Sequence, residues 1–186
     1  MSLLVFGVSL FAIVHLMPLL FPSVKSNSVQ RIGENGYKGF FSVIALAAIV
    51  LIVIGWKNAP VSYLYYFPSL PRSVAYFLNF LSITLILSSY LPTRIKTLLR
   101  HPMLSGVMLW AFTHLLFNGE SRSIILFGII LIWCVIEILL LNKRDGQWEK
   151  PKAPSPISEV ILIALAGVLT FVIIKLHSTL SGVPLV

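Results

Sequence analysis

The sequence predicts an all-α protein, a polytopic transmembrane bundle of five to six helices. Hydrophobic residues make up 58% of the 186 residues and charged residues only 11%, whereas soluble domains carry about 25% charged residues. The apolar residues also gather into runs close to the ~20 residues that a bilayer-spanning helix requires. Residues 1–186 are therefore expected to form a single domain within a lipid bilayer.

Taken in order, the apolar runs place the expected helices at residues 2–21, 39–56, 74–91, 103–118, 124–142 and 159–177. The first run lacks the basic start and the small-residue cleavage site of a secretory signal, so we expect it to remain as a helix. The second and fourth runs are at or just under the usual spanning length and must use flanking residues or neighbouring helices. Residues 22–38 are expected to form a loop in which glycines serve as turn residues.

The basic residues predict the orientation of the chain. The loops after the first, third and fifth runs hold ten of the fourteen lysines and arginines, which places these loops in the cytoplasm and both termini outside. The third of these loops, residues 143–158, is charged and rich in proline, as is typical of an extended linker. Attraction to the anionic leaflet accounts for the net charge of +8, so we expect no nucleic-acid partner.

Few polar residues lie in the apolar runs, and most are expected to be structural. Cys134 is the single cysteine, which excludes an intrachain disulfide and a thiolate cluster and favours a packing role. Glu137 is expected to face Lys143 or Arg144 near the cytoplasmic boundary. Asn79, Ser82 and Thr84 are expected to make hydrogen bonds between helices. Neither a Walker motif nor a dinucleotide fingerprint is present.

Histidines are the strongest candidates for chemistry, because the chain has only four of them. His101 precedes Pro102 at an expected helix start, and His114 lies about 20 Å further along the same helix. His15 lies at a comparable depth in the first helix, and His177 lies near the end of the last one. Two neutral imidazoles on facing helices can bind a haem iron from both sides. The alternative is that each histidine bonds a neighbouring carbonyl or hydroxyl.

Three segments together resemble the NnrU family, and the resemblance covers nearly the whole chain. They are the helix that carries His15, the loop Arg31-x-Gly33-Glu34-x-Gly36-Tyr37, and the block Arg100-His101-Pro102-x-Leu104-x-Gly106-x-x-x-Trp110-Ala111-x-x-His114-Leu115-x-x-Asn118-Gly119. The last block is the most specific, since it joins a helix start, a glycine and two histidines in a fixed order.

The resemblance implies a function as well as a fold. The family is named from bacterial loci of nitric oxide and nitrite metabolism, which implies denitrification and a place in the bacterial inner membrane. It is related to the plant ζ-carotene isomerase, a membrane enzyme that uses haem b to isomerise a cis double bond in a polyene. By similarity, the two histidines that ligate its iron fall on His15 and His114. The relative has a cysteine, implicated in ligand exchange, where this chain has Ala111.

Two other functions stay open at this stage. Arg100 and His101 ahead of Pro102 also resemble the cofactor segment of membrane methyltransferases of the isoprenylcysteine type, where this region contacts S-adenosylmethionine. The chain lacks the adjacent acidic pair and the tyrosine that usually follow in those enzymes. The chain could also serve as a non-enzymatic scaffold, or as a sensor that binds nitric oxide or a hydrophobic small molecule.

Overall fold

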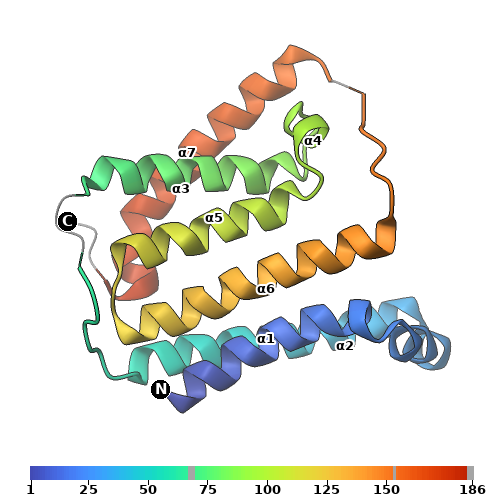
Figure 1. Ribbon diagram of the computed structural model, residues 1–186, viewed down its shortest axis with the longest axis horizontal. Coiled ribbons are helices and arrows are strands. Elements are labelled where there is room, and N and C mark those ends of the chain that lie inside the picture. Colours follow the sequence, from blue (N-terminus) through green and yellow to red (C-terminus); the bar gives the residue numbers. More distant parts are fainter. Residues whose placement is uncertain (67–69, 153, 184–186) are drawn as a thin grey trace. The chain divides into compact units, whose positions relative to one another are not determined.

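A computed structural model of the protein describes residues 1–66, 70–152 and 154–183, and this part of the chain is almost entirely helical (Figure 1). The helices are α1 (Ser2–Leu20), α2 (Pro22–Asn58), α3 (Arg72–Ser88), α4 (Ile95–Leu98), α5 (Pro102–Phe117), α6 (Ser121–Asp145) and α7 (Pro156–Ser181). Each of the six apolar runs lies largely within one of these helices, which confirms the all-α prediction.

The helices divide by length in a way that fits a membrane. Four of those described, α1, α2, α6 and α7, are long and apolar enough to span a bilayer, while α3 and α5 are apolar but have only 17 and 16 residues. Large apolar side chains such as Phe6, Ile13 and Leu46 are exposed on these helices, as expected of surfaces that face lipid. The protein is a multi-pass membrane protein.

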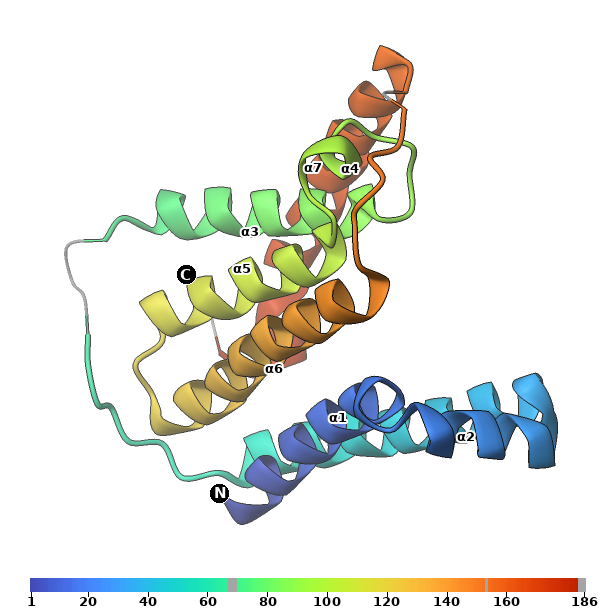
Figure 2. The ribbon, with the colours of Figure 1, turned by 45° about the vertical axis from the view of Figure 1, so that its right-hand side comes forward.

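The chain forms two compact units, each described here by itself. The first comprises Met1–Tyr66 and Asn118–Gly146, and in it α1 packs against both α2 and α6. Helix α1 and the second half of α2 run antiparallel and side by side (Figures 1 and 2). Their backbones approach closely at two glycines: a Cβ on Gly7 would lie 2.8 Å from the Ile52 nitrogen, and one on Gly55 would lie 2.5 Å from the Leu4 nitrogen.

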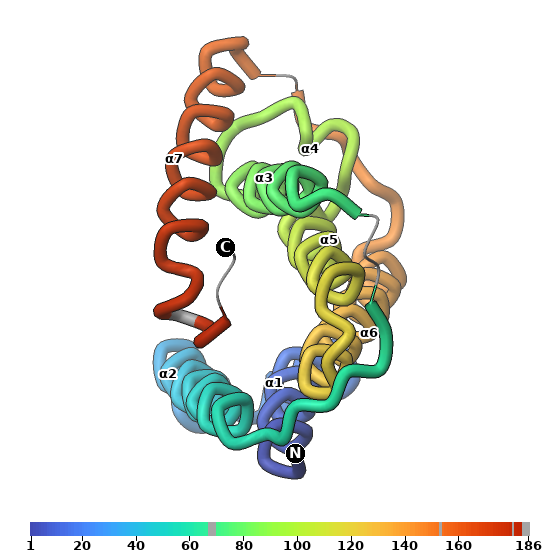
Figure 3. Tube along the Cα trace, turned by 90° about the vertical axis from the view of Figure 1, so that its left-hand side faces the viewer, coloured from blue at the N-terminus to red at the C-terminus, as the bar shows by residue number. Residues whose placement is uncertain are grey.

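The second unit comprises Phe67–Phe117 and Gln147–Val186. In it α3 packs against α5 and α7, which can be followed along the chain trace in Figure 3. Gly106 on α5 sits directly against α3, because a Cβ there would lie 2.7 Å from the Ser82 carbonyl oxygen. The buried Ser82 hydroxyl donates to the Gly106 carbonyl at 2.8 Å, so a small residue and a polar residue join the two helices.

The predicted loop at residues 22–38 is wrong, because this segment is the first part of α2. Its charges face outward and form helical pairs such as Glu34–Lys38 at 2.7 Å, so the segment is a polar helix without an apolar run. Gly33 interrupts α2 with φ 74° and ψ 165°. The expectation that glycines turn the chain here is therefore confirmed at Gly33, while Gly36 is helical.

Other boundaries and bonds also differ from the predictions. The linker predicted at residues 143–158 is shorter, because α6 runs to Asp145 and α7 begins at Pro156, and its Ala153 lies outside the described residues. The hydroxyl of Ser82 does bond between helices. Asn79 and Thr84 instead donate at 2.8 Å to carbonyls of their own helix, four residues earlier. A helical Thr or Asn always has such a carbonyl within reach, so no partner helix is needed.

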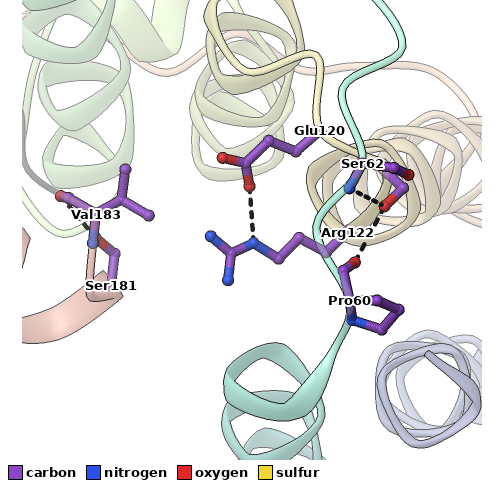
Figure 4. Close-up of polar contacts among 7 residues, drawn as sticks. Pro60, Ser62, Glu120, Arg122, Ser181 and Val183 are labelled. Atoms are coloured by element: carbon purple, nitrogen blue, oxygen red, sulfur yellow. Dashed lines mark hydrogen bonds and ion pairs between the residues drawn. The ribbon is translucent and has the colours of Figure 1, made fainter.

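Within the first unit, the segment after α2 pairs with the start of α6. The Leu64 nitrogen donates to the Gly119 carbonyl and the Ser121 nitrogen donates to the Ser62 carbonyl, both at 2.8 Å. The Ser121 hydroxyl adds a bond to the Pro60 carbonyl at 3.3 Å (Figure 4). These bonds satisfy backbone groups that would otherwise lie unpaired between two helices.

Charged and aromatic side chains close the same junction. Glu120 accepts a 2.7 Å hydrogen bond from Arg122 Nε (Figure 4), and the guanidinium of Arg122 lies 4.4 Å from the ring centroid of Trp56. Gly119 lies so close to the Tyr65 backbone that a Cβ would collide with it. Burial raises the pKa of the Tyr65 phenol above its ordinary value, because the phenolate form would lose hydration.

Gly33→Ala should destabilise the protein by about 1–3 kcal/mol, because the backbone conformation at this position is essentially restricted to glycine. Gly39→Ala on the same helix is the matched control, since its Cβ would meet nothing within 4 Å, and it should be neutral or slightly stabilising. Thermal unfolding in detergent measures both variants. Equal melting temperatures for the two would contradict the assigned bend.

Gly106→Ala should cost about 1–3 kcal/mol by forcing α5 away from α3. The added methyl group would meet the backbone of Ser82 and Ile86 rather than a flexible side-chain end. Gly167→Ala on α7 is the control, because nothing lies within 4 Å of its Cβ position. A melting temperature for Gly106→Ala that matches this control would mean that α3 and α5 do not approach closely there.

Candidate functional site

His15 lies on α1 within a group of aromatic rings from all three helices of the first unit. Its ring centroid is 4.2 Å from that of Phe11, 5.1 Å from Phe41 on α2 and 5.3 Å from Trp133 on α6. Nδ1 lies 2.8 Å from the Phe11 carbonyl oxygen four residues earlier. Because a carbonyl can only accept, Nδ1 carries the hydrogen and the lone pair of the neutral imidazole is on Nε2.

Nε1 of Trp133, whose ring contacts His15, and Oε2 of Glu137, one turn later on α6, are buried. The Trp133 indole N–H interacts with the Glu137 carboxylate, so these two polar groups face one another. The expected pairing of Glu137 with Lys143 or Arg144 is not seen, because Arg144 bonds Asp145 at 2.6 Å and Glu137 is in no ion pair within the described part of the chain.

A surface pocket of about 670 Å³ adjoins the same group of rings. Its lining includes Pro18 of α1 and Lys25, Glu34, Lys38 and Phe41 of α2. Phe41 is therefore shared between the pocket and the contacts of His15. Lys38 pairs with Glu34 at 2.7 Å on this wall, so the attraction for an anionic group comes mainly from Lys25.

His114 lies on α5 in the second unit and repeats the hydrogen-bond geometry of His15. Its Nδ1 is 2.8 Å from the Trp110 carbonyl oxygen, again four residues earlier, and its ring centroid is 4.9 Å from that of Trp110. The neighbouring Thr113 hydroxyl donates to the Leu109 carbonyl at 2.8 Å. In both His15 and His114, Nδ1 thus bonds a nearby carbonyl, as the structural alternative to haem binding predicts.

The structure also brings His177 of α7 to His114, which the sequence did not predict. The two ring centroids are 6.4 Å apart and the rings are nearly parallel, at 24°. His177 had been expected only to end the last helix. The only feature of the sequence that could have indicated His177 as a site residue is that the chain has just four histidines.

Arg100 and His101 lie at the start of α5, as expected. Pro102 is the first residue of the helix, and the His101 carbonyl accepts hydrogen bonds from the nitrogen and the hydroxyl of Ser105, both at 3.0 Å. They therefore lie at the opposite end of α5 from His114. A role for either in binding a cofactor stays a prediction.

Cys134 and Ala111 are both fully buried. The packing role expected for Cys134 agrees with this burial. Ala111 lies one turn before His114 on α5, and its methyl group is packed in the interior of the protein.

The comparison with family models decides the classification. The model described as NnrU protein matches residues 3–185. The chain belongs to the NnrU family. The match spans both units, so the histidines, the pocket and the junction all lie within the NnrU domain. No curated protein and no solved structure matches this NnrU chain.

Proposed function

We propose that this NnrU-family membrane protein binds haem b, with His114 and His15 as histidine ligands to iron. The observation that carries the proposal is the hydrogen bond that each Nδ1 makes to a carbonyl of its own helix. Histidines that ligate metals typically donate their other ring N–H in this way, which fixes the tautomer and orients Nε2 towards the metal. That both histidines bind the same iron stays a prediction, because they belong to different units.

The donor set fits a porphyrin better than a bare metal ion. Within the described residues no group of three or more His, Cys, Asp and Glu side chains could hold a metal. A structural zinc site uses about four such ligands. Haem brings its own equatorial nitrogens and requires only axial ligands from the protein.

The surroundings of His15 suit the other parts of haem. The rings of Phe11, Phe41 and Trp133 form an apolar wall. Lys25 lines the adjoining pocket and could pair with one propionate carboxylate, and Lys38 could pair with the other by exchanging its ion pair with Glu34.

Bound haem would supply an iron centre that accepts nitric oxide or an electron. The chain's own residues would bind it, exclude water with their aromatic rings and neutralise its carboxylates. We propose a role in nitric oxide and nitrite metabolism at the bacterial inner membrane, or in isomerisation of a cis polyene as in the plant relative. Both kinds of ligand dissolve in lipid, which suits a site among membrane helices.

The absorption spectrum of the purified protein supplied with haem tests the proposal. We expect a Soret band that is lost in His114→Ala and weakened in His15→Ala, with haem retention at least ~10-fold lower in the first variant. Thr113→Val is the matched control beside His114 and should retain the band. A colourless wild-type protein would refute haem binding. A spectral shift with nitric oxide, or conversion of a cis polyene, would then separate the two roles.

Replacing Lys25 and Lys38 together by alanine should weaken haem retention severalfold while leaving the Soret maximum in place, because the lysines would hold carboxylates rather than iron. Lys57→Ala at the other end of α2 is the control, since Lys57 is exposed and lies away from the pocket. Unchanged haem retention in the double variant would mean that the pocket does not receive the propionates.

A further inference from the structure

The pair formed by His114 and His177 lies entirely within the second unit. The rings come from α5 and α7, and their centroids are 6.4 Å apart. Each metal–imidazole bond measures about 2.0 Å and the ring centre lies roughly 1 Å beyond the nitrogen, so two imidazoles across one metal have centroids ~6 Å apart. The observed separation is close to the distance between two imidazole centroids that share one metal.

The C-terminal end of α7 fixes the position of the His177 ring through contacts of its Nδ1 atom. Its Nδ1 lies 3.0 Å from the Val183 carbonyl oxygen and 3.2 Å from the Ser181 hydroxyl. Gly182 makes this possible, because its φ of 71° turns the chain back after the helix and only glycine adopts that conformation readily. The Ser181 hydroxyl accepts a hydrogen bond from the Val183 nitrogen at 3.0 Å and lies 3.3 Å from the Val183 carbonyl oxygen (Figure 4).

These contacts give His177 the same tautomer as the other two helix histidines. With Nδ1–H donated to the Val183 carbonyl, the lone pair is on Nε2. A carbonyl that fixes the tautomer of a ligating imidazole is the usual outer support of a metal site. In His15 and His114 this support comes from the helix itself, whereas in His177 a turn beyond the helix supplies it.

We propose that His177 is a ligand to the metal that His114 binds. The inference rests on the proposed function for the identity of that metal as haem iron, and it gives His114 a partner ligand within its own unit. Haem iron takes only two axial ligands, so on this proposal His177 and His15 are alternatives for the ligand position that His114 leaves open.

The test compares haem coordination in a background that lacks His15. In His15→Ala the haem that remains should be six-coordinate and low-spin, by absorption and electron paramagnetic resonance, because His177 would supply the second histidine ligand. Adding His177→Gln should convert it to a five-coordinate high-spin form, and free imidazole should restore the low-spin spectrum. Thr179→Gln, an exposed position on α7, is the matched control and should keep the low-spin spectrum.

Identical spectra for His15→Ala with and without His177→Gln would overturn the inference and leave haem binding intact. A wild-type protein without a Soret band would overturn the proposed haem function, and Cu²⁺ then serves as the probe, since imidazole suits copper. Nitrogen hyperfine structure in the Cu²⁺ resonance that is lost in both His114→Gln and His177→Gln would support the pair as a metal site. A copper spectrum that is the same in the wild-type protein and in both variants would overturn the assignment of this pair as a metal site.

Discussion

Close approach of helix backbones at glycine is the constraint on which both units depend. Lipid tails are as apolar as the helix surfaces, so burial of apolar area does little to draw membrane helices together. Van der Waals contact must do this instead, and it grows as backbones come closer. Gly7 and Gly55 allow this between α1 and α2, and Gly106 allows it between α5 and α3. The histidines of each unit are held where these contacts place their helices.

Polar groups in a membrane must find hydrogen-bond partners within the protein, because water is absent there. This second requirement accounts for the tautomer of the histidines. An imidazole within an apolar helix has one hydrogen to donate, and the carbonyl four residues earlier is the nearest acceptor. His15 and His114 both use it. A histidine that bonds a carbonyl of its own helix can therefore still be a metal ligand. The hydrogen bond uses Nδ1–H and leaves the lone pair on Nε2. The same hydrogen bond holds the side chain against its helix and would leave Nε2 to bind iron under the proposed function.

The sequence predicted the helices that an apolar run of sufficient length defines. It did not predict features that depend on a polar helix or on contacts between distant segments. Apolar runs of near-spanning length located every long helix, because length and composition alone determine them. The polar start of α2 was missed, since a helix with charged faces produces no apolar run. Hydrogen bonds of Asn79 and Thr84 were assigned to other helices although their own backbone is nearer. The scarcity and depth of histidines indicated His15 and His114, and the resemblance assigned them as ligands. The neighbour of His114 depended on α3 packing against both α5 and α7, which no single segment encodes.

The bend at Gly33 has a mechanical consequence for the pocket beside His15. Lys25 lies before the bend, while Lys38 and Phe41 lie after it, and all three line the same pocket. Everywhere else along α2 the spacing of side chains is fixed by helical hydrogen bonds, but here it is set by two backbone torsions of a glycine. The separation of Lys25 from Lys38 and Phe41 across the pocket thus depends on the torsions of one residue, so a substitution at Gly33 would alter the shape of the pocket without touching its lining.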